Sequence, residues 1–188
     1  GYKYGPGDVK YKDLNGDGEI TWGNKTAANS GDWSRIGNST PRYEYNFRLG
    51  VDWHGVDIGI FFQGVGKRDY WATGTMIIPG WNFSEGTYYA HQTDYWTTTN
   101  TDAYYPRLTE LNQPGQYSAA SFNFLCQSRY LLDMSYLRLK NVTIGYSLPK
   151  VVLDKMHFQK FRIYLSAENL AEFDHLGNLP IDPETATS

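Results

Sequence analysis

Apolar and polar residues alternate strictly along the stretch Arg42–His54. Every second position from Tyr43 to Trp53 is apolar, whereas the positions between them hold Glu, Asn, Arg, Gly or Asp. Successive side chains of a β-strand point to opposite faces, so this pattern predicts a strand with one apolar and one polar face. The apolar row begins and ends in aromatic rings, and its length matches the roughly 9–11 residues with which a tilted strand crosses a bilayer.

A second alternating stretch follows directly, with Val56, Ile58, Ile60 and Phe62 on one face. Only a His-Gly dipeptide separates it from the first stretch. A two-residue connection that contains glycine is typical of a tight hairpin, so we expect these two strands to pair with each other.

Two further strands are expected at Tyr136–Leu148 and Phe161–Ala167, where apolar residues again occupy alternate positions. In the first of these the apolar parity changes after Leu139, as it would at a β-bulge near Lys140. The stretch Pro149–Phe158 between the two strands predicts a short connection of about one helical turn.

The alternation is compatible with two kinds of fold. A soluble sandwich or barrel with one solvated face alternates in this way, and so does the wall of an outer-membrane barrel. Charged residues opposite unbroken apolar rows favour the membrane barrel, because a wet lumen accommodates them and a packed core does not. These residues are Arg42, Arg48, Asp52 and Arg162. Four strands cannot close around a lumen, since even the smallest membrane barrels have about eight.

We therefore expect an all-β fold of antiparallel transmembrane strands that form part of a larger barrel. Short turns alternate with long connections, as they do in barrels with short periplasmic turns and long extracellular loops. The expected organisation is an extracellular loop at 1–41, a barrel hairpin at 42–66, a long extracellular loop at 67–129, a second hairpin at 130–168 and the start of a further loop at 169–188. The residues expected to face lipid are Tyr43, Tyr45, Phe47, Leu49, Val51, Trp53, Val56, Ile58, Ile60 and Phe62.

Composition and charge exclude several functional classes. The 188 residues carry a net charge of −3 with no basic stripe, so nucleic acid is not an expected partner. A single cysteine excludes an internal disulfide framework and a Cys-rich zinc site. The sequence has no apolar run long enough for a transmembrane helix. Sixteen Tyr, nine Phe and six Trp instead favour β-structure with long loops.

One loop carries a calcium-type motif. The sequence DLNGDGEI, which begins at Asp13, matches the start of the pattern D-x-[DN]-x-[DN]-G, in which alternate residues direct hard oxygens to one point. The twelfth position is Asn24, so the usual bidentate glutamate is missing. The alternative is an Asx-rich turn without an ion. The candidate ligands of a structural Ca²⁺ are Asp13, Asn15, Asp17, Glu19 through its carbonyl, and Asp32.

Aromatic residues crowd the long segment between the second and third strands. Sugars present flat C–H faces that stack on such rings, so some of them are candidates for contact with a substrate or a partner. The alternative is that each ring packs the loop against itself. The candidates are Trp81, Tyr88, Tyr89, Tyr95 and Trp96, and Tyr104 and Tyr105 belong to the same group.

No catalytic arrangement is evident. The four histidines occur singly, with no HExxH pattern. There is no GxSxG elbow either. The sequence GVGK at Gly64–Lys67 lacks the full phosphate-loop frame and leaves a strand for a loop. We therefore expect no enzymatic activity and no organic cofactor.

Several segments resemble one known family. They are GDVKYKDLNGDGEI, RIGNSTPRYEYNFRLGVDWHGVDIGIFFQGVGKRDYW, SYLRLKNVTIGYSLPK and FRIYLSAENL, in this order. Together they resemble the C-terminal part of the barrel in SusC/RagA-type TonB-dependent outer-membrane transporters. The resemblance extends from about Gly7 to Leu170, and its most specific parts are Asp57–Asp69 and Ser135–Pro149.

The resemblance implies a barrel of about 22 strands with an N-terminal plug, in the outer membrane of a Gram-negative bacterium. It also implies TonB-driven import of oligosaccharides or peptides, with a SusD-like surface lipoprotein as a lid over the extracellular mouth. The plug, the TonB-binding segment and a closing strand are not in this sequence, so we expect it to be a piece of a longer polypeptide. The alternatives are a secreted calcium-stabilised β-sandwich that binds carbohydrate and a fragment of a secreted glycoside hydrolase.

Overall fold

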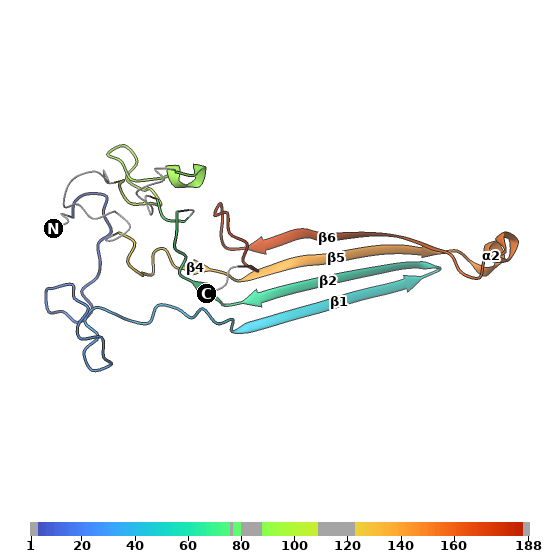
Figure 1. Ribbon diagram of the computed structural model, residues 1–188, viewed down its shortest axis with the longest axis horizontal. Helices are drawn as coiled ribbons and strands as arrows, with labels where there is room; N and C mark the ends of the chain where they lie inside the picture. Colours follow the sequence, from blue (N-terminus) through green and yellow to red (C-terminus); the bar gives the residue numbers. More distant parts are fainter. Residues whose placement is uncertain (1–3, 76, 80–87, 109–122, 186–188) are drawn as a thin grey trace. The chain divides into compact units, whose positions relative to one another are not determined.

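The computed structural model describes residues 4–75, 77–79, 88–108 and 123–185 (Figure 1). The chain divides into two compact units, which we call the loop unit and the sheet unit. The loop unit comprises Gly1–Gly37, Trp71–Leu131 and Asn178–Pro180, and the sheet unit comprises Asn38–Tyr70, Leu132–Gly177 and Ile181–Ser188. In the part of the chain that the structure describes, no helix is long and apolar enough to span a membrane.

The sheet unit contains one four-stranded antiparallel sheet with the strand order β1–β2–β5–β6. Its strands are β1 (Tyr43–Trp53), β2 (Val56–Gly66), β5 (Tyr136–Ser147) and β6 (Arg162–Asp174), drawn as four long arrows side by side in Figure 1. The all-β antiparallel class expected from the sequence is confirmed. A short pair, β3 (Asp69–Tyr70) with β4 (Leu132–Asp133), continues from the ends of β2 and β5.

The turn between β1 and β2 is the predicted two-residue hairpin. His54 and Gly55 both have positive φ, 49° and 87°, as the central residues of a type I′ turn do. A Cβ atom on Gly55 would lie 2.7 Å from the carbonyl oxygen of Ser147, so only glycine fits there without a shift. The hairpin pairs its residues directly from Trp53 with Val56 to Tyr43 with Gly66.

The predicted bulge in the third long strand is also present. The register of β2 with β5 shifts between Phe61 and Phe62, opposite the step from Asn141 to Leu139, which leaves Lys140 as the extra residue of β5. Because paired residues share a face of the sheet, this extra residue restores Leu139 and Val142 to one face.

Strand β6 is longer than the sequence predicted. It continues to Asp174 because a second irregularity, where Leu139 pairs with Ala171 and Asn141 with Glu168, adds a residue to β6. Asn169 has a positive φ of 51° at this point. This interruption hides the alternation of the second half of the strand.

The connection from β5 to β6 holds the helix α2 (Lys150–Met156). Val152 and Leu153 donate backbone hydrogen bonds to the carbonyl of Pro149, which begins the helix. His157 ends it in the left-handed conformation, with φ of 57°. Figure 1 shows α2 at the same end of the sheet as the β1–β2 turn.

The described residues of the loop unit form mainly irregular chain, with the short 3₁₀ helix η1 (Ala90–Thr93). Its described core is formed by Ile78, Tyr105, Phe124 and Tyr130. A polar cluster adds to this core, because Asp8 accepts a hydrogen bond of 2.9 Å from Asn123 and pairs with Arg107 at 2.7 Å.

Candidate functional site: a two-faced sheet

One face of the sheet is apolar across all four strands. Direct pairs place Leu49 beside Ile60 and Val51 beside Ile58 in the first hairpin. The same rows continue through β5 into β6, where Ile144 pairs with Leu165. The ten residues predicted from parity to share a face therefore do so.

This apolar face is exposed. The exposed fractions are 55% for Leu49, 61% for Val51 and 74% for Leu165. Phe47 stacks on Phe62 at 4.7 Å between ring centroids, yet 43% of Phe47 stays accessible. Side chains of this kind, side by side over four strands, form a patch that in a soluble domain would be covered.

The Tyr45 side chain lies across the apolar face near the N-terminal end of β1. A Cβ atom on Gly64, its direct partner, would lie 2.5 Å from the Tyr45 ring, so glycine leaves the space that the ring occupies. The Tyr45 hydroxyl donates to the carbonyl of Tyr136 at 3.2 Å. The ring therefore spans β2 and joins β1 to β5, a contact that alternation alone does not reveal.

The opposite face of the sheet is polar. Arg48 stacks over Phe61 with 5.2 Å between the guanidinium and the ring centroid. Asn141, Thr143 and Ser166 form a hydrogen-bonded group with distances of 3.0–3.1 Å. The sequence prediction that one face is polar and partly charged is therefore correct.

An ion pair lies on this polar face near the β1–β2 turn. Arg162 Nε donates to Asp57 Oδ1 at 2.9 Å, and Nη2 donates to Oδ2, so the contact is bidentate. A Cβ atom on Gly145 would lie 2.5 Å from both side chains. Gly145 thus provides the space in which the pair forms, and Arg162, predicted to face a lumen, has a fixed partner.

A larger ionic cluster lies at the other end of the polar face. Arg138, which is 7% exposed, pairs with Glu172 on β6 and with Asp182 and Glu184 in the segment after β6. Lys140 adds a contact of 2.9 Å to Glu184. We call these five residues the Arg138 cluster. Two cations meet three carboxylates in it.

The Arg138 cluster holds residues 181–185 against the polar face. Asp182 Oδ1 also accepts the amide of Glu184 at 2.9 Å, and Pro183 between them is fully buried. Burial alone would raise the pKa of Asp182, but the hydrogen bonds from Arg138 and the Glu184 amide outweigh it and lower that pKa. The sequence analysis did not predict this cluster. The signal in the sequence was the pair of cations on β5, Arg138 and Lys140, which need acidic partners when they are buried.

The calcium-type loop has the two positive-φ glycines that its turn requires, Gly16 at 78° and Gly18 at 85°. Asp13 accepts the amides of both, at 2.6 and 2.9 Å. Asn15 Oδ1 accepts the Asp17 amide, and Asp17 Oδ1 accepts the Glu19 amide. The side-chain oxygens therefore organise the turn itself.

Asp32, a predicted candidate ligand of Ca²⁺, binds backbone amides on both sides of this loop. Its two carboxylate oxygens accept the amides of Leu14 and Thr21, each at 2.7 Å. These backbone hydrogen bonds lower the pKa of Asp32. The hydrogen bonds of Asn15 and Asp17 have the form of Asx turns. Among the described residues no three His, Cys, Asp or Glu side chains gather around one point. Calcium in this loop remains a prediction.

The loop aromatics separate into two kinds. Tyr88 and Tyr89 are 43% and 38% exposed. Tyr95 and Trp96 are half-buried, and the Trp96 amide donates to the Tyr105 carbonyl at 3.0 Å. The Trp96 ring lies against Gly7, where no Cβ atom would fit. Trp81 lies outside the described residues.

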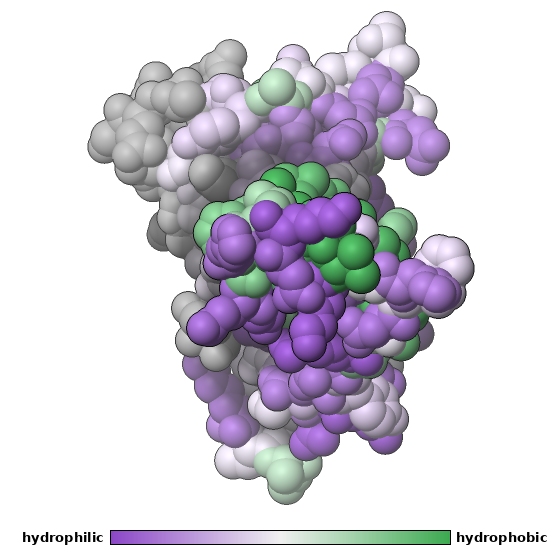
Figure 2. Space-filling view, turned by 90° about the vertical axis from the view of Figure 1, so that its right-hand side faces the viewer, coloured by the Kyte–Doolittle hydropathy of each residue, from purple (hydrophilic) through white to green (hydrophobic). Residues whose placement is uncertain are grey.

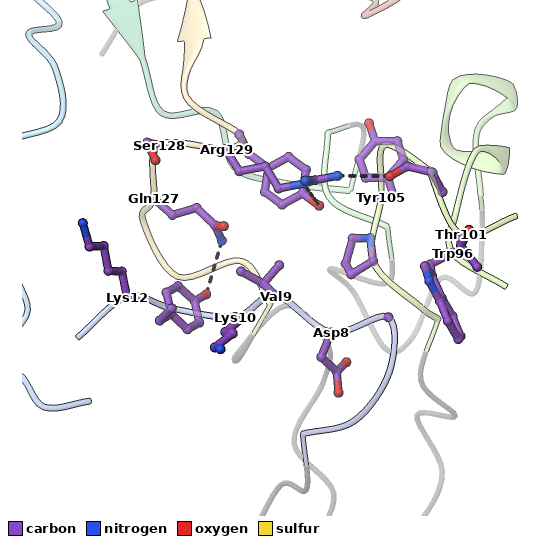
Figure 3. A pocket seen from close by; sticks show the side chains of 15 residues that line it. Asp8, Val9, Lys10, Lys12, Trp96, Thr101, Tyr105, Gln127, Ser128 and Arg129 are labelled. Atoms are coloured by element: carbon purple, nitrogen blue, oxygen red, sulfur yellow. Dashed lines mark hydrogen bonds between the residues drawn. The ribbon is translucent and has the colours of Figure 1, made fainter. Parts of the chain in front are cut away.

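The loop unit also contains an open pocket of about 550 Å³, which sequence reasoning did not predict (Figure 3). Lys10, Lys12, Trp96 and Arg129 contribute to its lining. Arg129 is held by the Ala103 carbonyl at 3.0 Å, and Gln127 donates to the Tyr11 hydroxyl at 3.2 Å. The pocket lining thus combines cationic and aromatic side chains.

Comparison with known proteins gives relatives of one kind. The chain is 33% identical over 183 residues to TonB-dependent receptor P3 of Formosa agariphila. This match covers 95% of this chain and 16% of that protein. It is 28% identical over 167 residues to TonB-dependent receptor P26 of the same organism, covering 87% of this chain and 15% of the relative. The chain therefore spans about a sixth of the length of these relatives. No family model matches it.

Solved structures show the same fold. The RagAB peptide transporter matches 78% of this chain with a TM-score of 0.57 and 23% identity, over 15% of that chain. The RagAB peptide importer in its closed-closed state matches 90% of this chain with a TM-score of 0.57 and 22% identity, over 18% of that chain.

The sheet with one apolar and one polar face thus has the fold of barrel strands in an all-β transporter. The expected resemblance is confirmed: the chain is similar in sequence to two TonB-dependent receptors, and its fold is that of a stretch of the RagAB transporter.

Proposed function

We propose that β1, β2, β5 and β6 are four adjacent wall strands of an outer-membrane importer. The apolar face lies against lipid and the polar face lines the interior. The observation that carries this proposal is the exposed apolar face, continuous across four strands and backed by ion pairs on the opposite face. Lipid is the environment in which such a face needs no further cover.

We further propose that the whole protein imports peptides or oligosaccharides across the outer membrane of a Gram-negative bacterium. Energy would come from TonB acting on a plug, and a SusD-like surface lipoprotein would cover the mouth. The names of the relatives support TonB dependence, and the name of the structural neighbour favours peptides as cargo. In this function the chain performs no covalent chemistry.

The loop unit would lie on the extracellular side, where its exposed rings are available to cargo or lid. Tyr88 and Tyr89 are the best candidates among the described aromatics, because both rings are exposed. Tyr89 also stacks with His91 at 5.9 Å between ring centroids, which fixes the orientation of its ring. Tyr95 and Trp96 contribute mainly to the packing of the loop.

The experiment compares positions on opposite faces of the β1–β2 hairpin in the full-length protein. Val51→Arg and Ile60→Arg place a charge on the lipid face, at a cost of about 2–4 kcal/mol near the bilayer midplane. We expect poor assembly, measured as loss of the heat-resistant folded band on a gel. Arg48→Ala, on the interior face, is the matched control and should assemble normally.

Normal assembly of Val51→Arg and Ile60→Arg would overturn the lipid-facing assignment. An equal defect in Arg48→Ala would show that the two faces are assigned wrongly.

The carbohydrate-binding sandwich is a weaker alternative. In a sandwich the apolar face of one sheet packs on a second sheet about 10 Å away. Here Leu49, Val51 and Leu165 are more than half exposed. A full-length protein that stays dispersed without detergent would revive this alternative. Glycan hydrolysis that a single Asp or Glu substitution abolishes would instead favour a hydrolase.

A further inference from the structure

The connection between β5 and β6 exposes more apolar surface than a turn in water requires. Helix α2 buries Leu153 and leaves its other apolar side chains accessible. The exposed fractions are 71% for Val151, 37% for Val152, 47% for Met156, 50% for Phe158 and 43% for Phe161. A polar turn would serve as well to join two strands, so these side chains need another explanation.

This apolar surface continues the apolar face of the sheet. The amide of Leu148 donates to the carbonyl of Phe161 at 3.0 Å, so strand pairing extends one step beyond Ser147 and Arg162. By alternation Phe161 shares the face of Ile163. The Phe158 ring lies 6.2 Å from the Phe161 ring, which carries the face out to the end of α2.

Cations border this surface. Lys150, Lys155 and Lys160 lie within or beside it, and Asp154 is the one acidic residue between 150 and 161. Figure 2 views the molecule from this end and shows hydrophobic surface directly beside strongly hydrophilic surface. A mixture of apolar side chains and lysines is typical of a segment that lies among phospholipid headgroups, where lysine stems cover apolar surface and the ammonium groups meet phosphate.

We propose that residues 150–161 form an interfacial anchor in the headgroup layer of the leaflet nearest the strand turns. Val152, Met156 and Phe158 point toward the acyl chains, and the lysines bind phosphate oxygens. The proposal rests on the lipid-facing orientation of the sheet given above. It adds that the barrel wall does not end at Trp53 and Tyr146 but extends into the headgroups through α2.

The test uses the full-length protein in vesicles of phosphatidylethanolamine and phosphatidylglycerol, in a background free of native cysteines. Nitroxide labels are placed singly at Met156 and Phe158, and power saturation compares collisions with oxygen, which enriches in lipid, and with a water-soluble nickel chelate. Asp154 is the matched control on α2, because a helix turns 100° per residue and places it about 160° around the axis from Val152 and Met156.

We expect labels at Met156 and Phe158 to shift toward oxygen accessibility and the label at Asp154 to remain accessible to nickel. Nickel accessibility at both Met156 and Phe158 would overturn the anchor. A label at Val51 separates this result from the proposed function. If Val51 is oxygen-accessible while Met156 and Phe158 are not, the wall assignment stands and the anchor fails. If Val51 reports water, the wall assignment itself fails.

Discussion

Among single residues, Gly145 has a role that depends on the space around it. The Asp57–Arg162 pair passes directly over its Cα, and an added Cβ would come within 2.5 Å of both side chains. Gly59 is a glycine of the neighbouring strand where an added Cβ would meet nothing within 4 Å. The two positions therefore separate the effect of crowding from the general effect of replacing a strand glycine.

We predict that Gly145→Ala displaces the Asp57–Arg162 pair and destabilises the folded protein by up to about 1 kcal/mol, the usual contribution of an exposed ion pair, because the charged ends that a Cβ would meet can shift. Gly59→Ala should be neutral or slightly stabilising, since glycine weakens a strand. Urea unfolding of the full-length protein in detergent measures both. Equal effects of the two substitutions would show that the ion pair does not depend on the space above Gly145.

The calcium-type loop supports a second prediction at this scale. If Asp13 and Asp17 each use their remaining lone pairs on an ion, the double substitution Asp13→Ala, Asp17→Ala removes one bound Ca²⁺ per chain. Calorimetric titration with calcium measures the stoichiometry, and Asp102→Ala, in another exposed turn, is the control. A stoichiometry that the double substitution leaves unchanged would contradict calcium binding in this loop.

At the scale of elements, the Arg138 cluster connects β5, β6 and the segment after β6. Its central guanidinium is nearly buried, while the three carboxylates are partly exposed, at 26% for Glu172, 42% for Asp182 and 29% for Glu184. Removing one partner of a buried ion pair leaves the others uncompensated. The segment 181–185 should therefore depend on Arg138 for its place on the polar face.

We predict that Arg138→Met costs about 3 kcal/mol, the lower part of the range for breaking a buried pair, and releases this segment. Hydrogen exchange at Glu184 and Thr185, whose amides now bond to Asp182, should become fast. Arg162→Met, which breaks the other ion pair of the same face, is the control and should leave these amides protected. Unchanged protection in Arg138→Met would mean that Pro183 packing alone holds the segment.

The elements differ in how far the sequence reveals them. The hairpin, the β5 bulge and the face of each apolar residue follow from local alternation, because a strand directs neighbouring side chains to opposite faces. The second half of β6 was missed because its irregularity at Asn169 breaks that alternation. The Arg138 cluster joins residues 34 to 46 positions apart, and no local pattern reports which carboxylates will reach one arginine.

At the scale of the whole molecule, the sheet is bordered by two long strands. β1 and β6 each pair on one side only among the described residues, with β2 and β5 respectively. Such long edges with exposed apolar side chains pair readily with other strands. In the full-length protein, neighbouring wall strands would cover these edges, and lipid would cover the apolar face.

We therefore predict that the 188-residue chain, produced alone, does not remain a monomer in water. Two uncovered edges and an apolar face across four strands should drive it into aggregates that detergent disperses only in part, since detergent covers the face but cannot pair the edges. The full-length protein, whose barrel would satisfy the edges, should be monodisperse in the same detergent. Size-exclusion chromatography with light scattering distinguishes the two samples. A stable, monodisperse 188-residue chain in buffer alone would contradict the barrel wall, because a self-contained module would then hide its apolar face without lipid or further strands.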